Sequence, residues 1–399
     1  MKKITILALH LGYGGIERCI SNLVNSLCND YEIEIISTYK LFDTPVFKID
    51  DKVTIKYLIT DMKPNKKEIK EALSKFKIIT LVKELIKSKK ILKLKKELMI
   101  NYIKNCHSDI IISTRDIHNL WLSKYGDSSS LKIGWEHNFH NNDQKYINKM
   151  IKSVYGLNYF VLVSKSLKEF YDGKTGNCKC VYIPNSISYI PKNKSKLDGK
   201  NLISVGRLEV EKGYSDLIDV FEMVHKIYPD LKLNIIGDGS LREELQKKIN
   251  KLNLSDSIIL HGFKDSKYIE KELLKSSIYL MSSLTESFGL VLIEASSFGL
   301  PCIAFSSANG ACEIIKDNWD GYLIENRDKE KMAKRIVNLI KNPERRIIMG
   351  DNAYKKSINY KADRLTMVEK QKIRAANEEV PPIPEPPTDS DEDEDLTES

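Results

Sequence analysis

The sequence predicts an α/β protein with two Rossmann-like domains, each built on a parallel sheet. Short apolar runs alternate with helical patterns, as expected for parallel strands joined by crossover helices. A polar, Lys- and Asn-rich stretch at residues 191–200 interrupts this alternation, which then begins again. The 399 residues, 42% of them hydrophobic, suffice for two cores. We therefore predict domains at residues 1–195 and 196–355 facing a central cleft.

The apolar runs place the expected strands in order along the chain. Each is short, rich in β-branched or aromatic residues and followed by a turn or a helical pattern. In the first half the predicted strands cover residues 4–9, 33–37, 53–58, 109–113, 132–135, 159–164 and 181–183. In the second half they cover residues 201–205, 232–237, 257–260, 277–281 and 301–305. The loops after such strands meet at one sheet edge, where open α/β sheets bind ligands.

A lysine-rich segment from Lys63 to Lys104 interrupts the first half. Residues 63–96 contain thirteen lysines and three acidic residues, with apolar residues at helical spacing. We predict a basic amphipathic insertion at residues 63–104. A surface helix packed on its own domain would explain this pattern. So would a helix on anionic lipid headgroups, to which each lysine contributes about 1 kcal/mol. Nucleic acid is not an expected partner, because the segment lacks interleaved aromatic residues.

The charge is unevenly distributed, and the C-terminal end differs from the rest. The net charge is +8, but residues 378–399 contain ten acidic residues and no lysine or arginine, so the remainder carries +18. A basic body suggests anionic partners such as phosphates or membrane surfaces. Proline and self-repelling charge predict a disordered acidic tail at residues 377–399.

Cysteine usage and hydropathy indicate in which cellular compartment the protein resides. The seven cysteines are scattered and include no Cys-x-x-Cys pair, which favours reduced thiols in a cytosolic protein and disfavours zinc. The N-terminal apolar run is short and reads as a first strand, and no run reaches transmembrane length. We predict a cytoplasmic protein, with peripheral attachment to the inner face of the cell membrane if the insertion binds lipid.

Two carboxylates eight positions apart, Glu286 and Glu294, form the first candidate site. Glu286 follows an apolar strand in a turn with a Phe-Gly-Leu corner, and Glu294 lies in the following helix, expected about two turns in. One explanation of the pair is a solvated helix face with an N-terminal cap and no ligand. Yet Glu294 lies among apolar residues, where a carboxylate needs hydrogen-bond donors. The free N–H groups of the helix N-terminus would suit phosphates.

Arg207 and Lys212 form the second candidate site. They follow a short strand that ends in Gly206 and precede a helical pattern from Tyr214. A basic turn without a ligand is one explanation. The other is a diphosphate, because the guanidinium fork matches phosphate oxygens and the ammonium supplies a mobile charge. Two such cations would stabilise the charge on a departing nucleoside diphosphate.

Two further loops in the first half carry candidate residues. Gly15 lies in a glycine-rich turn between the first strand and a helix, where either turn geometry or close approach of a phosphate requires glycine. His137 follows the strand at 132–135, and His140 is the alternative if the register differs by one turn. His137 would hydrogen-bond a sugar or share charge with a phosphate. We expect Glu136 to be a surface or supporting residue.

These motifs occur in an order that resembles family-four glycosyltransferases, which are retaining, nucleotide-sugar-dependent enzymes of the GT-B fold. The resemblance extends over roughly residues 1–355. The N-terminal loop matches a Gly-Gly-x-Glu pattern frequent in that family. The series in the second half is Gly206-Arg207, Lys212-Gly213, Gly237-Asp238-Gly239, His261-Gly262-Phe263, Glu286 with Glu294, and Gly299-Leu300-Pro301.

The resemblance implies a role for each candidate residue. Arg207 and Lys212 would contact the donor diphosphate, Glu294 the ribose and Glu286 the transferred sugar. The other implied donor contacts are the backbone of Phe288, Gly289 and Leu290, the main chain near Phe263 at the base, and Gly15 near a phosphate. Family members commonly end in a helix that crosses back to the first domain, which we place at residues 356–376.

The function implied is transfer of a hexose from a nucleotide diphosphate sugar, a UDP-sugar by resemblance, to a hydroxyl of a lipid-linked glycan in bacterial surface polysaccharide synthesis. We expect no cofactor and no metal, because the Asp-x-Asp pattern occurs only in the acidic tail, where composition explains it. The alternatives are a nucleotide-sugar epimerase of similar fold and a non-catalytic sugar-binding homologue. Incubation with donor alone would separate the epimerase from the transferase.

Overall fold

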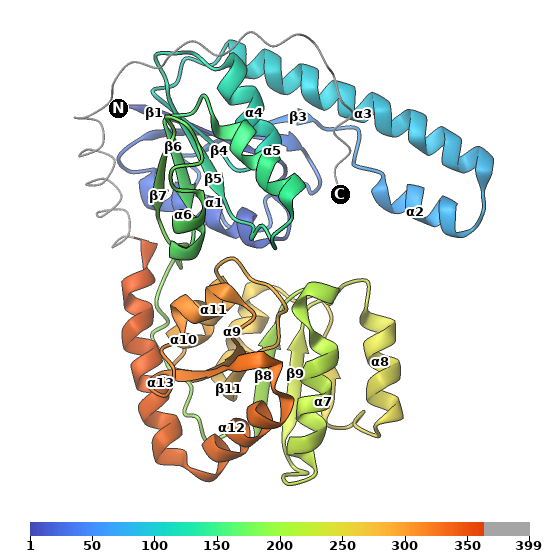
Figure 1. Cartoon of the computed structure of the whole chain (residues 1–399), viewed down its shortest axis with the longest axis vertical. Helices are drawn as coiled ribbons and strands as arrows, with labels where there is room; N and C mark the ends of the chain where they lie inside the picture. The colour runs from blue at the N-terminus through green and yellow to red at the C-terminus, as the bar shows by residue number, and fades with distance from the viewer. Residues whose placement is uncertain (363–399) are drawn as a thin grey trace.

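The computed structural model describes residues 1–362 and contains two parallel α/β domains, drawn one above the other in Figure 1. Within these residues the first sheet has the strand order β3-β2-β1-β4-β5-β6-β7 and the second has the order β10-β9-β8-β11-β12-β13. All paired strands run parallel. Each order reverses beside the first strand of its domain, which creates the crevice where doubly wound sheets bind ligands.

The first domain alternates strands and helices as the apolar runs predict. Its strands are β1 (Lys3–Ala8), β2 (Glu32–Tyr39), β3 (Thr54–Ile59), β4 (Ile110–Ser113), β5 (Leu131–Glu136), β6 (Tyr159–Leu162) and β7 (Lys179–Tyr182). Its helices are α1 (Gly15–Leu27), α2 (Lys66–Ser74), α3 (Ile78–Lys104), α4 (Asp116–Tyr125), α5 (Gln144–Val154) and α6 (Lys165–Tyr171). The lysine-rich insertion therefore forms a hairpin of two helices, α2 and α3.

The second domain repeats the pattern. Its strands are β8 (Asn201–Val205), β9 (Lys232–Ile236), β10 (Ile258–Leu260), β11 (Ser276–Met281), β12 (Cys302–Phe305) and β13 (Gly321–Ile324). Its helices are α7 (Tyr214–His225), α8 (Arg242–Lys251), α9 (Ser266–Leu274), α10 (Leu290–Ser297), α11 (Asn309–Ile314), α12 (Lys329–Lys341) and α13 (Pro343–Ser357), with 3-10 turns η1 (Val210–Lys212), η2 (Glu325–Arg327) and η3 (Ile358–Tyr360). The edge strand β13 was not predicted.

The core follows from burial on both faces of each sheet. Central strands such as β8, which reads Asn-Leu-Ile-Ser-Val, are largely apolar because helices cover both faces. One buried cluster in the second domain includes Leu202, Phe221, Leu280 and Phe305. The cluster of the first domain continues through Phe288 and Leu292 of the second, so apolar contacts cross between the domains.

The chain returns to the first domain after α13. Figure 1 shows α13 rising from the second domain toward β7. The Ile187 backbone N–H donates to the Tyr360 carbonyl at 2.9 Å, and the Ala362 N–H donates to the Ile187 carbonyl at 3.0 Å. The predicted crossing helix at 356–376 lies mostly outside the described residues. The predicted acidic tail at 377–399 lies entirely outside them.

Candidate functional site

The loop between β11 and α10 presents Glu286 at the carboxyl end of the second sheet. It ends at Gly289, whose φ of 88° is a left-handed conformation that favours glycine. The Gly310 N–H donates to the Glu286 carbonyl at 2.9 Å, and a side chain at Gly310 would collide with the Phe288 backbone. The loop is therefore held by backbone contacts that fix the direction of Glu286.

Lys212 and Glu286 form an ion pair in this structure. Lys212 Nζ lies 2.5 Å from Glu286 Oε2, and the two side chains are only 21% and 17% exposed. Lys212 ends η1, just after β8, and Gly213 follows in a left-handed conformation with φ of 63°. The loops after β8 and β11 thus bring together two residues 74 positions apart. A small cavity beside this pair is lined by Ser204, Val205, Lys212, Tyr214, Tyr279, Met281, Ser282, Ser283 and Val291.

Arg207 and Glu294 have other partners. Arg207 is 70% exposed and its Nη2 lies 2.9 Å from Glu211 Oε1. Glu294 lies in the second turn of α10, closer to the helix start than expected, because the helix begins only at Leu290. Its Oε1 lies 3.4 Å from Nη2 of Arg18 on α1 of the first domain. Burial raises the pKa of Glu294, while Arg18 opposes that rise.

His137 lies beside the Glu286 loop, across the boundary between the domains. The Ser287 hydroxyl donates to the His137 carbonyl, and the Thr285 hydroxyl donates to Asn141 Oδ1 at 2.6 Å. Both ring nitrogens of His137 are buried and lack a hydrogen-bond partner in the described part of the chain. Burial, reinforced by the charge of Arg115, lowers the pKa of His137 to about 3. The imidazole is therefore neutral and offers one donor and one acceptor.

Two charged residues near His137, Glu17 and Arg115, were not predicted as site residues. Glu17 Oε1 lies 2.9 Å from Arg115 Nη2 and 3.5 Å from His10 Nδ1. Glu17 is buried and folds back over Gly14, whereas the position of a side chain at Gly15 opens into empty space. The glycine-rich loop thus exposes the backbone at Gly15. The Gly-x-x-Glu spacing of Gly14 and Glu17 was the available signal.

Glu136 was expected to be a surface or supporting residue; it is buried, so the surface alternative is wrong and the supporting one fits. It ends β5, and its carboxylate accepts from the Tyr146 hydroxyl at 2.8 Å and from the Asn138 N–H at 2.6 Å. Burial raises the pKa of Glu136 to about 7, although these hydrogen bonds oppose the shift. Because Asn138 immediately follows His137, Glu136 supports the loop that carries the histidine.

Three partly exposed aromatic rings meet where the two domains approach each other. Phe263 follows β10, and its ring centroid lies 3.9 Å from that of Tyr13 in the first domain. Tyr13 also meets Phe42 edge-on, with the ring centroids 5.2 Å apart. Phe263 therefore faces the first domain, where its ring is in contact with an aromatic side chain.

Glu313 of α11 joins the two domains and was not assigned a role from the sequence. Its carboxylate accepts from the backbone N–H groups of Lys165 at 3.0 Å and Ser166 at 3.1 Å. These groups begin α6, where the N–H groups are otherwise without intrahelical partners. Glu313 therefore links the two domains through hydrogen bonds.

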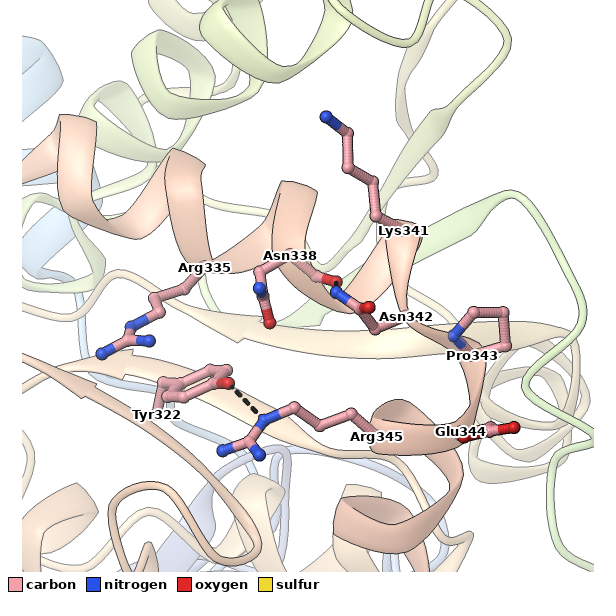
Figure 2. Close-up of a pocket in the computed structure, with 8 residues that line it drawn as sticks. All are labelled: Tyr322, Arg335, Asn338, Lys341, Asn342, Pro343, Glu344 and Arg345. Carbon is pink, nitrogen blue, oxygen red and sulfur yellow. Dashed lines mark hydrogen bonds between the residues drawn. The ribbon is translucent and has the colours of Figure 1, made fainter.

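A surface groove of about 690 Å³ lies away from these loops, at the amino end of β13 (Figure 2). In it, Arg345 Nε donates to the Tyr322 hydroxyl at 2.9 Å, and the Arg335 guanidinium stacks on the Tyr322 ring. Parallel strands place their carboxyl ends at the opposite edge, so this groove is separate from the site around Glu286.

Two features are absent from residues 1–362. No group of three or more His, Cys, Asp or Glu side chains within that range is arranged to hold a metal ion. Nor does any helix in the same range combine the length and apolar character needed to span a membrane.

Two Rossmann-like domains whose loops meet at the boundary between them define the GT-B fold. The sequence matches the family described as "Glycosyl transferases group 1" over residues 186–356. It is 30% identical over 374 residues to an uncharacterized glycosyltransferase of Haemophilus influenzae, covering 92% of this chain and 98% of that protein. The chain therefore belongs to the group 1 glycosyltransferases, which is consistent with the predicted family-four resemblance.

Two further similarities are informative. An N-acetylgalactosaminyltransferase of Campylobacter jejuni, named for a diphospho-undecaprenol-linked glycan, is 26% identical over 363 residues, covering 88% of this chain and 93% of that one. The crystal structure of an S. aureus TarM variant with UDP, fondaparinux and alpha-GlcNAc-glycerol superposes with a TM-score of 0.76 at 17% identity, covering 94% of this chain and 100% of that one. The structural similarity confirms the predicted fold class.

Proposed function

We propose that this glycosyltransferase is a retaining enzyme that moves a hexose from a UDP-sugar to a hydroxyl of a lipid-linked glycan in bacterial surface polysaccharide synthesis. Membership of the family supports glycosyl transfer. The names of the relatives support a UDP-bound fold and a polyprenol-diphosphate-linked acceptor. Retention of anomeric configuration follows from the family-four resemblance.

The Lys212–Glu286 ion pair, facing the His137 loop, is the observation that carries the proposal. Without donor, Glu286 balances the charge of Lys212. When a diphosphate arrives, Lys212 pairs with phosphate oxygens and Glu286 is released toward the sugar hydroxyls. Lys212, Arg207 and the N-terminal N–H groups of α10 then stabilise the negative charge that develops on the leaving nucleoside diphosphate. We propose that this donor activation requires no metal ion.

The remaining residues bind and orient the two substrates. Glu294 accepts hydrogen bonds from the ribose hydroxyls after exchanging its contact with Arg18. Neutral His137 hydrogen-bonds the transferred sugar through its unpartnered nitrogens. Because the domains touch through Ser287 and Glu313, their closure excludes water, so that transfer is favoured over hydrolysis.

The test is a transfer assay with UDP-, GDP- and ADP-sugars and a polyprenol-diphosphate-linked saccharide, with and without EDTA. We expect an extended glycan with retained anomeric configuration, released UDP and no effect of EDTA. Glu286→Ala and Lys212→Ala should each lower transfer by about 100-fold. The matched control is the Glu222–Lys226 pair at the end of α7, whose alanine variants should transfer normally.

Three outcomes would overturn the proposal. A sugar altered in the absence of acceptor would identify an epimerase. Donor binding without turnover across a broad acceptor panel would identify a binding homologue. Normal rates in both Glu286→Ala and Lys212→Ala would contradict the site.

A further inference from the structure

The α2–α3 hairpin projects from the first domain as an arm (Figure 1). Its base is fixed, because Asn65 Nδ2 donates to the Glu84 carbonyl at 2.7 Å and to Glu84 Oε2 at 2.8 Å. Ala72 of α2 is buried between the two helices. The arm is therefore a defined structural element, and its tip is the turn from Lys75 to Lys77.

The two halves of α3 differ in how they treat their apolar residues. In the second half, Ile91, Met99 and Ile103 are buried against the first domain. In the first half and the turn, large apolar side chains face solvent, and Phe76 is 90% exposed. We define the apolar tip as Leu73, Phe76, Ile78, Ile79, Val82 and Ile86. Several large exposed apolar side chains close together in sequence mark an interaction site, whereas single exposed apolar residues are ordinary.

The charge around the apolar tip restricts what can cover it. Residues 63–96 contain thirteen lysines and three acidic residues. A partner must therefore combine negative charge with a region that accepts isoleucine and phenylalanine. An anionic bilayer provides both, with phosphates at the level of the lysines and acyl chains beneath them. Nucleic acid provides only the charge.

We propose that the α2–α3 hairpin docks on an anionic lipid bilayer, with the apolar tip inserted below the headgroups and the lysines of both helices at the level of the phosphates. This proposal goes beyond the proposed function and does not rest on it, since it concerns binding without donor or acceptor. It also revises the sequence-based picture of a single helix lying flat on the lipid. Only the tip enters the lipid, because the second half of α3 is committed to the first domain.

The arm also relates the bilayer to the first domain. Because the arm projects from that domain, docking through the tip would hold the first domain close to the membrane surface, where a lipid-carried substrate would reside.

The experiment is co-sedimentation of the full chain with phosphatidylcholine vesicles containing about 30% phosphatidylglycerol, compared with phosphatidylcholine alone. We expect binding to the anionic vesicles that weakens with added salt. The test variant combines Phe76→Asn, Ile78→Asp and Ile79→Asp, and should bind at least about tenfold more weakly. The first turn of a helix favours aspartate, so the variant should fold. The matched control combines Ile227→Asp and Ile348→Asp, two exposed isoleucines of the second domain, and should bind normally.

Several results would overturn the proposal. One is failure of the unaltered protein to bind anionic vesicles, and another is equal binding by the tip variant. Sedimentation velocity without lipid tests the competing occupant. If the unaltered protein dimerises and the tip variant is a monomer, a second copy of the chain covers the apolar tip instead.

Discussion

The two walls of the cleft differ in how their polar groups are satisfied. On the wall of the second domain, the charged candidates are paired within that domain or across the boundary, as with Lys212 and Glu286. On the wall of the first domain, both ring nitrogens of His137 and Nε of Arg115 are buried and have no hydrogen-bond partner among residues 1–362. An unsatisfied buried polar group costs about 1–3 kcal/mol. The first wall is thus prepared to gain hydrogen bonds from a ligand, whereas the second must exchange existing ones.

The largest expected effect concerns the Lys212–Glu286 ion pair on the second wall, which is exchanged for contacts with the donor. Lys212→Ala and Glu286→Ala should each lower kcat/KM by about 100-fold, and the double variant by little more than either alone, because the two side chains act as one unit. Arg207→Ala should cost only about tenfold, since its guanidinium is exposed and paired with Glu211. A double-variant cycle measures the coupling. Additive losses in the cycle would show that the pair does not act through exchange.

A smaller effect is expected from removing the unpartnered nitrogens of the first wall. His137→Phe keeps a ring of similar size and should lower kcat/KM by about tenfold to 100-fold. Because burial and Arg115 lower the pKa of His137 to about 3, the histidine does not titrate near neutral pH. The pH dependence of kcat/KM should therefore have the same shape in the variant and the unaltered enzyme. A limb near pH 6.5 that disappears in His137→Phe would contradict a neutral histidine.

The carboxylates behind the two walls should respond to pH in opposite directions. Burial raises the pKa of Glu136 from 4.5 to about 7, so the folded protein keeps a proton that the unfolded chain has released. The stability contribution is complete below pH 4.5 and is lost as the pH rises to 7, by about 3 kcal/mol. Urea unfolding across this range should show the decline, and Glu136→Gln should abolish it.

Asp216 provides the control on the second domain. Burial alone would raise its pKa, but Arg327 and Lys329 bring it below the ordinary value of 3.8. Its contribution is therefore present above pH 3.8 and is lost as the pH falls through the lowered pKa. Asp216→Asn should destabilise the protein at neutral pH and have little effect in strong acid. If Glu136→Gln and Asp216→Asn changed the pH dependence of the free energy of unfolding in the same direction, the two domains would not differ in this respect.

The sequence predicted the elements of each domain well because the residues within each strand, and the turns beside it, determine where that strand forms. Buried parallel strands such as β11 are short apolar runs, and the glycines at 206, 213 and 289 mark the turns that follow or precede them. The exception, β13, is a four-residue edge strand, Gly-Tyr-Leu-Ile, whose run of three apolar residues is too short to stand out among its polar neighbours. Lys212 and Glu286 were predicted together because both follow strands of one sheet, and such ends share one edge.

Contacts between the domains could not be predicted in the same way. Glu294 with Arg18, Glu313 with the start of α6, and Ser287 with His137 each join residues far apart in sequence. They depend on how two finished domains approach, which local periodicity does not encode. Glu136 illustrates a second limit: its place at the end of β5 is readable, but its burial depends on α5, which supplies Tyr146.

The smallest expected effect tests a charged contact between α1 and α10 that joins the two walls. Arg18 Nη2 lies 3.4 Å from Glu294 Oε1, where it would compete with the ribose of the donor. Arg18→Ala should therefore tighten UDP binding by about threefold, the range of a partly exposed ion pair. Glu294→Gln should weaken it, and isothermal titration calorimetry measures both. Weaker binding by Arg18→Ala would instead mean that Arg18 contacts the donor directly, so that the first wall, too, carries charge for the diphosphate.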